Sequence, residues 1–138
     1  MPMPKPHTLT DLQIDIMKIL WKLGDATVAD VHREIQHKRD LAQPTVATLL
    51  SRLDKKGVIA HRTEGRQFIY HAVAKEADVK RSMIAQMKDT LFTGDVPALV
   101  NQLLSGRDIS KSDLEEVKAL IAEKERELER RAKKPKSK

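Results

Sequence analysis

Two stretches near the start of the chain carry apolar residues at every third or fourth position, the spacing of an amphipathic helix. The first covers residues 12–23 and is preceded by Thr10 and Gln13, which have the spacing of a capping box. A glycine follows it directly, so we expect the helix to end there. The second stretch covers residues 28–35, with Thr27 placed to cap its first turn. The pattern predicts two short helices joined by a tight turn.

The third helical stretch, residues 43–57, has two faces of different character. Its apolar face is formed by residues at helical spacing, namely Val46, Leu49, Leu50 and Leu53. Pro44 suits the first turn of a helix, and Gly57 suits the position just after the last turn. The opposite face carries small, hydroxyl-bearing and basic side chains: Thr45, Ala47, Thr48, Ser51, Arg52 and Lys55. Such a face suits the major groove of DNA, because small side chains allow close approach while hydroxyls and cations bind bases and phosphates. An ordinary amphipathic surface helix is the alternative interpretation.

After this helix the spacing changes to strict alternation, which indicates β-strands. Residues 58–63 and 67–73 form two candidate strands, and residues 64–66 form the turn between them. Three helices followed by a hairpin with a basic tip describe a winged helix-turn-helix, in which the third helix is the recognition helix. Arg62 and Arg66 stand where such a wing would contact the DNA backbone or minor groove. A small α+β domain that binds no nucleic acid is the alternative.

The remainder of the chain is predicted to be helical. Residues 75–92 carry a further apolar stripe, and a break at residues 94–97 starts a short helix that ends near Leu104. The start of a last helix is marked by Ser110 with Asp113 or by Ser112 with Glu115, since both pairs have the spacing of a cap. The predicted fold class is mainly α with a small β-hairpin, an N-terminal winged helix-turn-helix plus a C-terminal three-helix dimerisation module. The predicted bounds are 8–73 for the winged helix and 74–129 for the helical module, with disordered termini at 1–7 and 130–138.

The apolar stripes of the C-terminal module require a partner surface, because a module of three short helices buries too little surface by itself. Two copies packed around a twofold axis would cover the stripes, and they would match the paired half-sites that helix-turn-helix proteins bind. Docking onto the first domain of the same chain is the alternative. The predicted dimer contacts are Met83, Ile84, Met87, Leu91, Leu99, Val100, Leu103, Leu114, Val117, Leu120 and Ile121.

The composition argues against several classes of chemistry. The chain has no cysteine, which excludes disulfides, zinc fingers and thiol catalysis. Its histidines lack metal-ligand spacing, although His61 and His71 could face each other across the hairpin as a surface pair. The sequence contains no glycine-rich phosphate loop either. We therefore expect a protein that is not an enzyme and that holds no cofactor and no metal.

The formal net charge of +6 is unevenly distributed along the chain. Residues 1–73 hold 11 Lys and Arg against 8 Asp and Glu, residues 74–129 hold 9 against 12, and residues 130–138 hold 6 cations and no acid. The basic excess of the first half favours a polyanionic partner. The sequence shows no apolar run of membrane-spanning length and no signal-peptide pattern, so a cytoplasmic protein without membrane insertion is expected.

These observations predict separate roles for the polar residues of the third helix and the wing, with double-stranded DNA as the partner. The predicted contacts are Gln43, Thr45 and Thr48 for base edges, Ser51, Arg52 and Lys55 for phosphates, and Arg62 and Arg66 from the wing. Two alternatives stay open: a winged-helix regulator that senses a small molecule in its helical half, and a winged-helix module that binds protein partners.

The chain resembles the penicillinase-repressor family, which includes the methicillin-resistance and copper-homeostasis repressors. The most specific match is the pattern Thr-x-x-Thr-Leu-x-x-Arg-Leu-x-x-Lys-Gly over residues 45–57, directly before the wing. The likeness covers about residues 8–125, with further matches at Leu9–Gln13, Ile19–Trp21, Phe68–Tyr70, Leu99-Val100, Asp108–Ser110 and Leu114–Val117. The resemblance implies a homodimeric transcriptional repressor that binds palindromic operators and releases them when the dimer is disrupted. In the β-lactam branch of the family, a membrane sensor protease triggers cleavage in the dimerisation part.

Several departures from the family pattern concern regulation and operator choice. The copper-responsive branch uses a cysteine cluster, which this chain lacks, so copper sensing through thiolates is excluded. The β-lactam branch is cut at an Asn-Phe bond that aligns with Gln102-Leu103, and this pair is the candidate cleavage site here. Family members often have Arg in place of Ala47 and Pro in place of Gln43. The operator sequence should therefore differ from those of the antibiotic-resistance repressors.

Overall fold

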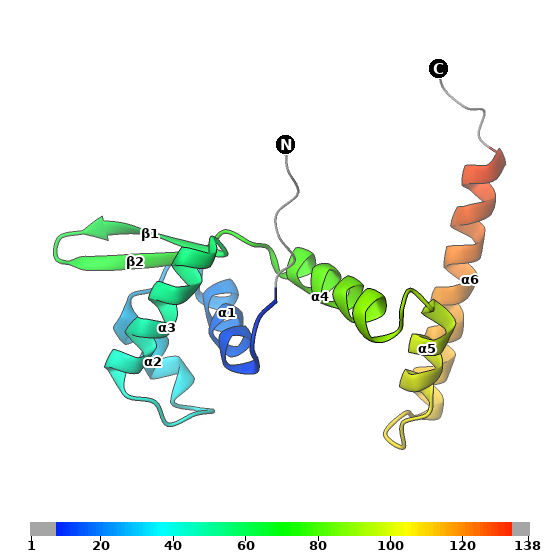
Figure 1. The fold of residues 1–138 in the computed structure, drawn as a ribbon, viewed down its shortest axis with the longest axis horizontal. Helices are drawn as coiled ribbons and strands as arrows, with labels where there is room; N and C mark the ends of the chain where they lie inside the picture. The colour runs from blue at the N-terminus through cyan, green and yellow to red at the C-terminus, as the bar shows by residue number, and fades with distance from the viewer. Residues whose placement is uncertain (1–7, 134–138) are drawn as a thin grey trace. The chain divides into compact units, whose positions relative to one another are not determined.

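The computed structural model describes residues 8–133, which divide into two compact units. The first unit ends at Thr93 and the second begins at Gly94. The elements of the first unit are α1 (Asp11–Leu23), α2 (Val28–Ile35), α3 (Gln43–Lys56), β1 (Ile59–Glu64), β2 (Gln67–Ala72) and α4 (Glu76–Leu91), shown in Figure 1. Those of the second unit are α5 (Val96–Leu104) and α6 (Lys111–Lys133). The predicted class, mainly helical with one small hairpin, is confirmed. The prediction for residues 1–7 lies outside the described residues.

The first unit has an apolar core to which α1, α2, α3 and the hairpin all contribute. Most residues of the predicted apolar stripes of α1, α2 and α3 are buried or partly buried in it. Its buried helical members include Ile16, Met17, Leu20, Val31, Ile35, Val46, Leu49, Leu50 and Leu53. Full burial of one such side chain stabilises the fold by about 1.5–3 kcal/mol relative to exposure. The spacing of apolar residues therefore accounts for the packing of the three helices.

Reciprocal side-chain caps determine where α1 and α2 begin. Thr10 Oγ1 accepts a hydrogen bond from the Gln13 backbone N–H at 3.1 Å, and Gln13 Oε1 accepts one from the Thr10 N–H at 3.0 Å. This capping box is the one predicted from the sequence. Thr27 and Asp30 form a second box at the start of α2. Each box gives partners to two N–H groups that the helix itself leaves unsatisfied.

The hairpin is antiparallel, and its register separates the two histidines considered above. His61 lies opposite Tyr70, and Ala60 lies opposite His71. Because successive side chains of a strand point to opposite faces, His61 and His71 occupy different faces of the hairpin. The surface histidine pair considered from the sequence does not form, because the strands are offset by one residue from the register it requires.

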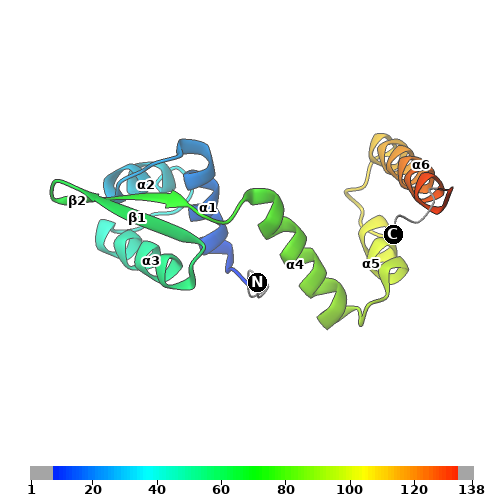
Figure 2. The same ribbon diagram turned by 90° about the horizontal axis from the view of Figure 1, so that it is seen from above.

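The hairpin is held to the helices at its base, and its turn lies away from α1 in both Figure 1 and Figure 2. Ala26, in the loop between α1 and α2, makes two backbone hydrogen bonds with Tyr70, at 2.9 and 2.8 Å. At the tip, Glu64 pairs with Gln67, so the connection is a two-residue turn with Gly65 at φ 62°. The wing therefore has a fixed base and a tight tip.

The first half of α4 packs on the core of the first unit. Val79 is buried in that core, and Met83 is partly buried against it. Trp21 Nε1 donates a hydrogen bond to the Ala74 carbonyl oxygen, just before α4, at 2.9 Å. The sequence places Met83 among the dimer contacts, whereas its side chain is partly buried against the core of its own chain. The division between the compact units falls after Thr93 rather than at the predicted boundary after residue 73, because the start of α4 has apolar partners in the winged helix.

The two helices of the second unit begin at side-chain caps. Asp95 Oδ1 accepts a hydrogen bond from the Ala98 N–H at 3.0 Å and caps α5. Before α6, Ser110 and Asp113 exchange two hydrogen bonds between side chain and backbone, each 3.0 Å long. Of the two pairs predicted to cap this helix, Ser110 with Asp113 is therefore the one that forms a capping box.

Among the described residues, no helix combines the length and the apolar character needed to cross a membrane.

The helix α6 continues past the predicted end of the helical module. It runs to Lys133, whereas the sequence places a disordered tail from residue 130 onward. Arg130 lies 3.5 Å from Glu123, and Arg131 lies 3.8 Å from Glu127. Cations in the last turn of a helix also interact favourably with its dipole, which explains why these residues stay helical. Residues 134–138 lie outside the described part of the chain.

Candidate nucleic-acid interface

The helix α3 has the two faces that its sequence predicts. Val46, Leu50 and Leu53 are fully buried, and Leu49 is 9% exposed. Pro44 lies in the first turn, and Gly57 ends the helix in the left-handed conformation at φ 84°. A side chain with a Cβ atom is strained at such a φ, so glycine defines the end of the helix. The remaining face is free of the core and available to a partner.

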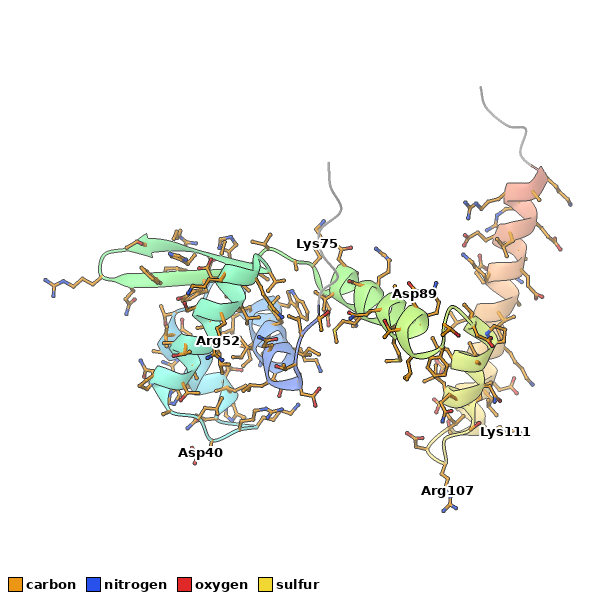
Figure 3. All side chains as sticks on the ribbon, in the orientation of Figure 1. Asp40, Arg52, Lys75, Asp89, Arg107 and Lys111 are labelled. Carbon is orange, nitrogen blue, oxygen red and sulfur yellow. The ribbon has the colours of Figure 1, made fainter. Side chains whose placement is uncertain are left out.

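The free face of α3 divides into two stripes. Gln43, Ala47 and Ser51, each one turn apart, line a groove next to the hairpin, which we call the wing groove. The second stripe lies further from the hairpin and is exposed to solvent; its members are Thr45, Thr48, Arg52 and Lys55. Figure 3 shows Arg52 on α3 and Asp40 in the loop that precedes the helix. The residues predicted to contact bases are thus split between the two stripes.

The wing groove has a volume of about 500 Å³ and is bounded by three elements. The helix α3 forms one side, the start of α2 forms the second, and β2 with the hairpin turn forms the third. Its lining residues are Thr27, Val28, Ala29, Gln43, Ala47, Ser51, Arg66, Gln67, Phe68 and Tyr70. The groove brings together three predicted DNA contacts, Gln43, Ser51 and Arg66. Val28 and Phe68 also line the groove, and neither was predicted from the sequence as a site residue.

His61 on β1 contacts aromatic rings within the hairpin and a carboxylate on α3. The His61 ring stacks on Phe68 with 4.3 Å between the ring centroids, and it is tilted against Tyr70 at 5.7 Å. His61 Nδ1 also contacts the Asp54 carboxylate near the end of α3. These contacts place Phe68, which is 47% exposed, at the edge of the groove. The alternation along β2 places Phe68 and Tyr70 on one face of the hairpin. It does not indicate that His61 contacts Asp54 on α3.

The two arginines predicted for the wing differ in their surroundings. Arg62 Nη2 lies 3.2 Å from Asp25, and its Nε lies 2.7 Å from Glu64. The hydrogen bonds that Arg62 donates to Asp25 and then to Glu64 raise the pKa of its guanidinium. Among residues 8–133, Arg66 forms no ion pair, and it lies in the hairpin turn beside the groove. The structure thus leaves the Arg66 charge available to a phosphate, while the Arg62 charge is compensated within the chain.

The loop before α3 is fixed by one buried carboxylate. Asp15 on α1 is 7% exposed, and it accepts hydrogen bonds from Lys38 at 2.9 Å and from Arg39 at 2.7 Å. The bond from Lys38 and then that from Arg39 lower the pKa of the Asp15 carboxyl. Nearby, His32 Nε2 lies 2.8 Å from the Leu41 carbonyl oxygen. Both contacts hold the chain that leads into α3, and neither was predicted from the sequence.

Comparison with known proteins identifies the family of this chain. The sequence model of the penicillinase repressor family matches residues 9–123, which is most of the chain. The chain belongs to the penicillinase repressor family. The resemblance seen in the sequence is thereby confirmed, and with it the coarse function of the family, DNA-binding transcriptional repression.

Two members of the family show how far the likeness extends. The methicillin resistance regulatory protein MecI of Mammaliicoccus sciuri is 27% identical over 120 residues, which cover 87% of this chain and 98% of that protein. The penicillinase repressor of Bacillus licheniformis is 27% identical over 121 residues, or 88% of this chain and 94% of that protein. Both relatives are matched over nearly their whole length.

Two solved structures are also similar. The complex structure of hsRosR-S4 covers 89% of this chain and 95% of that one at 17% identity, with a TM-score of 0.51, so the likeness concerns the fold. The solution structure of the DNA-binding domain of the repressor BlaI is 33% identical and covers 55% of this chain and 93% of that one, with a TM-score of 0.49.

The ionisable residues of this family member are arranged in pairs rather than in a metal-binding cluster. Within the described residues, no group of three or more His, Asp or Glu side chains could hold a metal ion. His61 is paired with Asp54, and Asp15 is paired with two cations. The free face of α3 itself carries amide, hydroxyl, small apolar and basic side chains, which can form hydrogen bonds, apolar contacts and contacts with negative charge.

Proposed function

We propose that this repressor binds a palindromic operator as a homodimer, with one α3 in the major groove of each half-site, and that repression ends when the two copies separate. Support on the DNA side comes from three cations, Arg52, Lys55 and Arg66, which form no ion pair among the described residues. Each can bind a phosphate, which fixes the register of a protein on the duplex. Arg52 and Lys55 belong to the exposed stripe of α3, and Arg66 lines the wing groove.

The proposed homodimer is supported by the exposure of apolar side chains on α4, α5 and α6. Leu91 is 71% exposed, Leu120 is 69% exposed and Leu103 is 62% exposed. No residue of α5 or α6 is buried. Of the predicted dimer contacts, those with exposed side chains are Ile84, Met87, Leu91, Leu103, Leu114, Leu120 and Ile121, while Leu99, Val100 and Val117 are half-buried. Apolar side chains in such number mark an interaction surface, and a second copy offers a complementary one.

The release step is proposed to act on the C-terminal helices. The candidate cleavage site, Gln102-Leu103, lies within the last turn of α5, and both side chains are exposed. A cut at this bond would detach α6, with Leu120 and Ile121, from the winged helix. The dimer would then lose part of its surface while the DNA-binding residues stay intact. A membrane sensor protease, as in the β-lactam branch, is the proposed trigger.

Sedimentation equilibrium and DNA titration test the proposal together. We expect the full chain to sediment as a dimer at micromolar concentration. We also expect a duplex with two inverted half-sites to bind about 10²- to 10⁴-fold more tightly than a duplex with one, because the second contact is intramolecular. A monomer that binds both duplexes equally would contradict the homodimer. Binding to protein partners without salt-dependent binding to DNA would instead support an interaction module.

A further inference from the structure

The first turn of α3 borders a second, shallower hollow that differs in character from the rest of the face. It has a volume of about 380 Å³ and is lined by Val28, Gln43, Pro44 and Ala47. Gln43 provides the only polar side chain among these lining residues. Within residues 8–133 the Gln43 amide makes no hydrogen bond, and the residue is exposed. The hollow, which we call the Gln43 hollow, therefore combines one unpaired amide with an apolar floor.

The chemistry of the Gln43 hollow matches one kind of base pair. A glutamine amide has a donor and an acceptor side by side, and it can pair in bidentate fashion with N7 and the N6 amino group of adenine in the major groove. Guanine presents two acceptors at the same edge, so the amide oxygen would face O6 without a hydrogen bond. The apolar side chains of Ala47 and Val28 suit the C5-methyl group of thymine. Both halves of the hollow thus favour A·T pairs.

The spacing along α3 places these two contacts within one half-site. Gln43 and Ala47 are four residues apart, which corresponds to about 6 Å along a helix axis. Successive base pairs are about 3.4 Å apart along the duplex. The residues at the N-terminal end of a recognition helix are those that contact base edges in helix-turn-helix proteins. One helix in the groove can therefore present the amide and the apolar floor to base pairs no more than two steps apart.

We propose that Gln43 recognises an adenine, and that Ala47 with Val28 receives a thymine methyl group within two base pairs of it, in each operator half-site. This inference rests on the proposed function, since it presumes that α3 lies in the major groove. It assigns part of the specificity of this chain to Gln43 and Ala47, the two positions of α3 at which the chain departs from the family pattern.

Parallel selections from a randomised duplex library test the adenine contact. The full-length wild type, Gln43→Ala and Gln43→Glu are each used to select bound duplexes at one salt concentration. We expect Gln43→Ala to relax the preference at one position per half-site, where the wild type requires adenine. Gln43→Glu should shift that position toward cytosine, because a carboxylate accepts from the cytosine N4 amino group. A relaxed position that is not adenine in the wild type, or no relaxed position with either variant, would overturn the assignment.

Base analogues test both contacts without changing the protein. In the selected operator, 7-deazaadenine removes N7 and uracil removes the thymine methyl group. We expect the first to raise Kd about 2- to 12-fold for the wild type, the value of the one hydrogen bond to N7, and to have no effect on Gln43→Ala. Uracil should raise Kd about fourfold, the value of one buried methyl-sized group. Unchanged Kd values with both analogues would contradict the inference.

The same selections distinguish a failure of this inference from a failure of the proposed function, and Lys55→Ala serves as the control. This variant loses a proposed phosphate contact, so it should bind every duplex more weakly with the same base preference. If the wild type selects no consensus at all, the proposed function is wrong. If it selects a consensus with inverted half-sites in which Gln43→Ala changes no adenine, only the assignment of Gln43 is wrong.

Discussion

Arg62 and Arg66 lie four residues apart on the hairpin, yet only one of them has a charge free to bind DNA. Arg62 contacts both Asp25 and Glu64. Arg66 forms no ion pair among the described residues and borders the wing groove. An arginine that already has two carboxylate partners must lose them before it can bind a phosphate. The two residues should therefore make different contributions to the salt dependence of DNA binding.

Replacing each arginine by alanine measures that difference. For Arg66→Ala we expect the slope of log K against log salt concentration to fall in magnitude by about 0.9, the value of one phosphate contact. For Arg62→Ala the slope should stay close to that of the wild type, because its charge is compensated within the chain. Fluorescence anisotropy titrations over a range of KCl concentrations give the slopes. Equal losses of slope in the two variants would show that Arg62 leaves its carboxylates when DNA binds.

These arginines also show which part of the site could be predicted from the sequence. Helical spacing was enough to identify the free face of α3, since the period of its apolar residues determines which side is buried. The pairing of Arg62 with Asp25 joins residues 37 positions apart, and no local pattern indicates it. The contact between His61 and Asp54 likewise depends on how the hairpin packs on α3. Spacing predicts which residues are exposed, but not which exposed charges already have partners.

The buried Asp15 carboxylate gives a second prediction at the scale of residues. Asp15→Asn should destabilise the fold by about 1–2 kcal/mol near pH 7, since it weakens hydrogen bonds to two cations that remain partly exposed to solvent. The pKa of Asp15 in the folded protein is lowered below the unfolded value of about 3.9. The stabilisation is therefore complete above that value and is lost as the pH falls through the folded pKa.

Urea unfolding at pH 7 and at decreasing pH below 4 measures this effect. Asp11→Asn is the matched control, because Asp11 is an exposed aspartate on the same helix, and most surface substitutions change stability by no more than about 0.5 kcal/mol. The difference between wild type and Asp15→Asn should shrink as the pH falls. A difference that is as large in acid as at pH 7 would mean that the ion pairs are not its source.

At the scale of elements, local signals predicted the boundaries well. The box of Thr10 with Gln13 and the glycine after α3 coincide with a helix start and a helix end in the structure. The division between the compact units was not predicted. Residues 74–129 were predicted to form the dimerisation module, with Met83 among its contacts, whereas Val79 and Met83 pack on the winged helix. A stripe alone does not show which of its residues face which partner.

Truncation tests this packing. A chain ending at Thr93 keeps Val79 and Met83 on the core, and a chain ending at Val73 exposes the core surface that they cover. We expect the shorter chain to be less stable by about 2–4 kcal/mol, the value of one buried and one partly buried apolar side chain. Thermal unfolding followed by circular dichroism compares the two. Identical midpoints would indicate that α4 adds nothing to the stability of the winged helix.

At the scale of the whole molecule, the proposed homodimer depends on the exposed apolar residues of α6. Leu120 is 69% exposed, and Ile121 beside it is 51% exposed. In the proposed homodimer these side chains are covered by the second copy. A charge placed among them would have to be buried without a partner, which is costly. The polar residues of the same helix should tolerate a charge.

Leu120→Glu is expected to yield a monomer with unchanged affinity for a single half-site. Its affinity for a duplex with two half-sites should fall by about 10²- to 10⁴-fold, because the second contact is no longer intramolecular. Ala119→Glu is the matched control, since this neighbouring residue is also exposed but lies on a different side of the helix. Sedimentation velocity and anisotropy titrations provide the two readouts. A dimeric Leu120→Glu variant would place the interface elsewhere.

The hydrogen bond from Trp21 to the Ala74 carbonyl oxygen has a practical consequence. The chain contains a single tryptophan, and its indole ring lies where the winged helix meets the start of α4. Indole emission moves to longer wavelength when the ring passes from apolar surroundings into water. The unlabelled protein therefore carries an optical probe at this junction. Its emission spectrum, recorded as operator DNA is added, would show whether α4 stays attached to the winged helix while the repressor is bound.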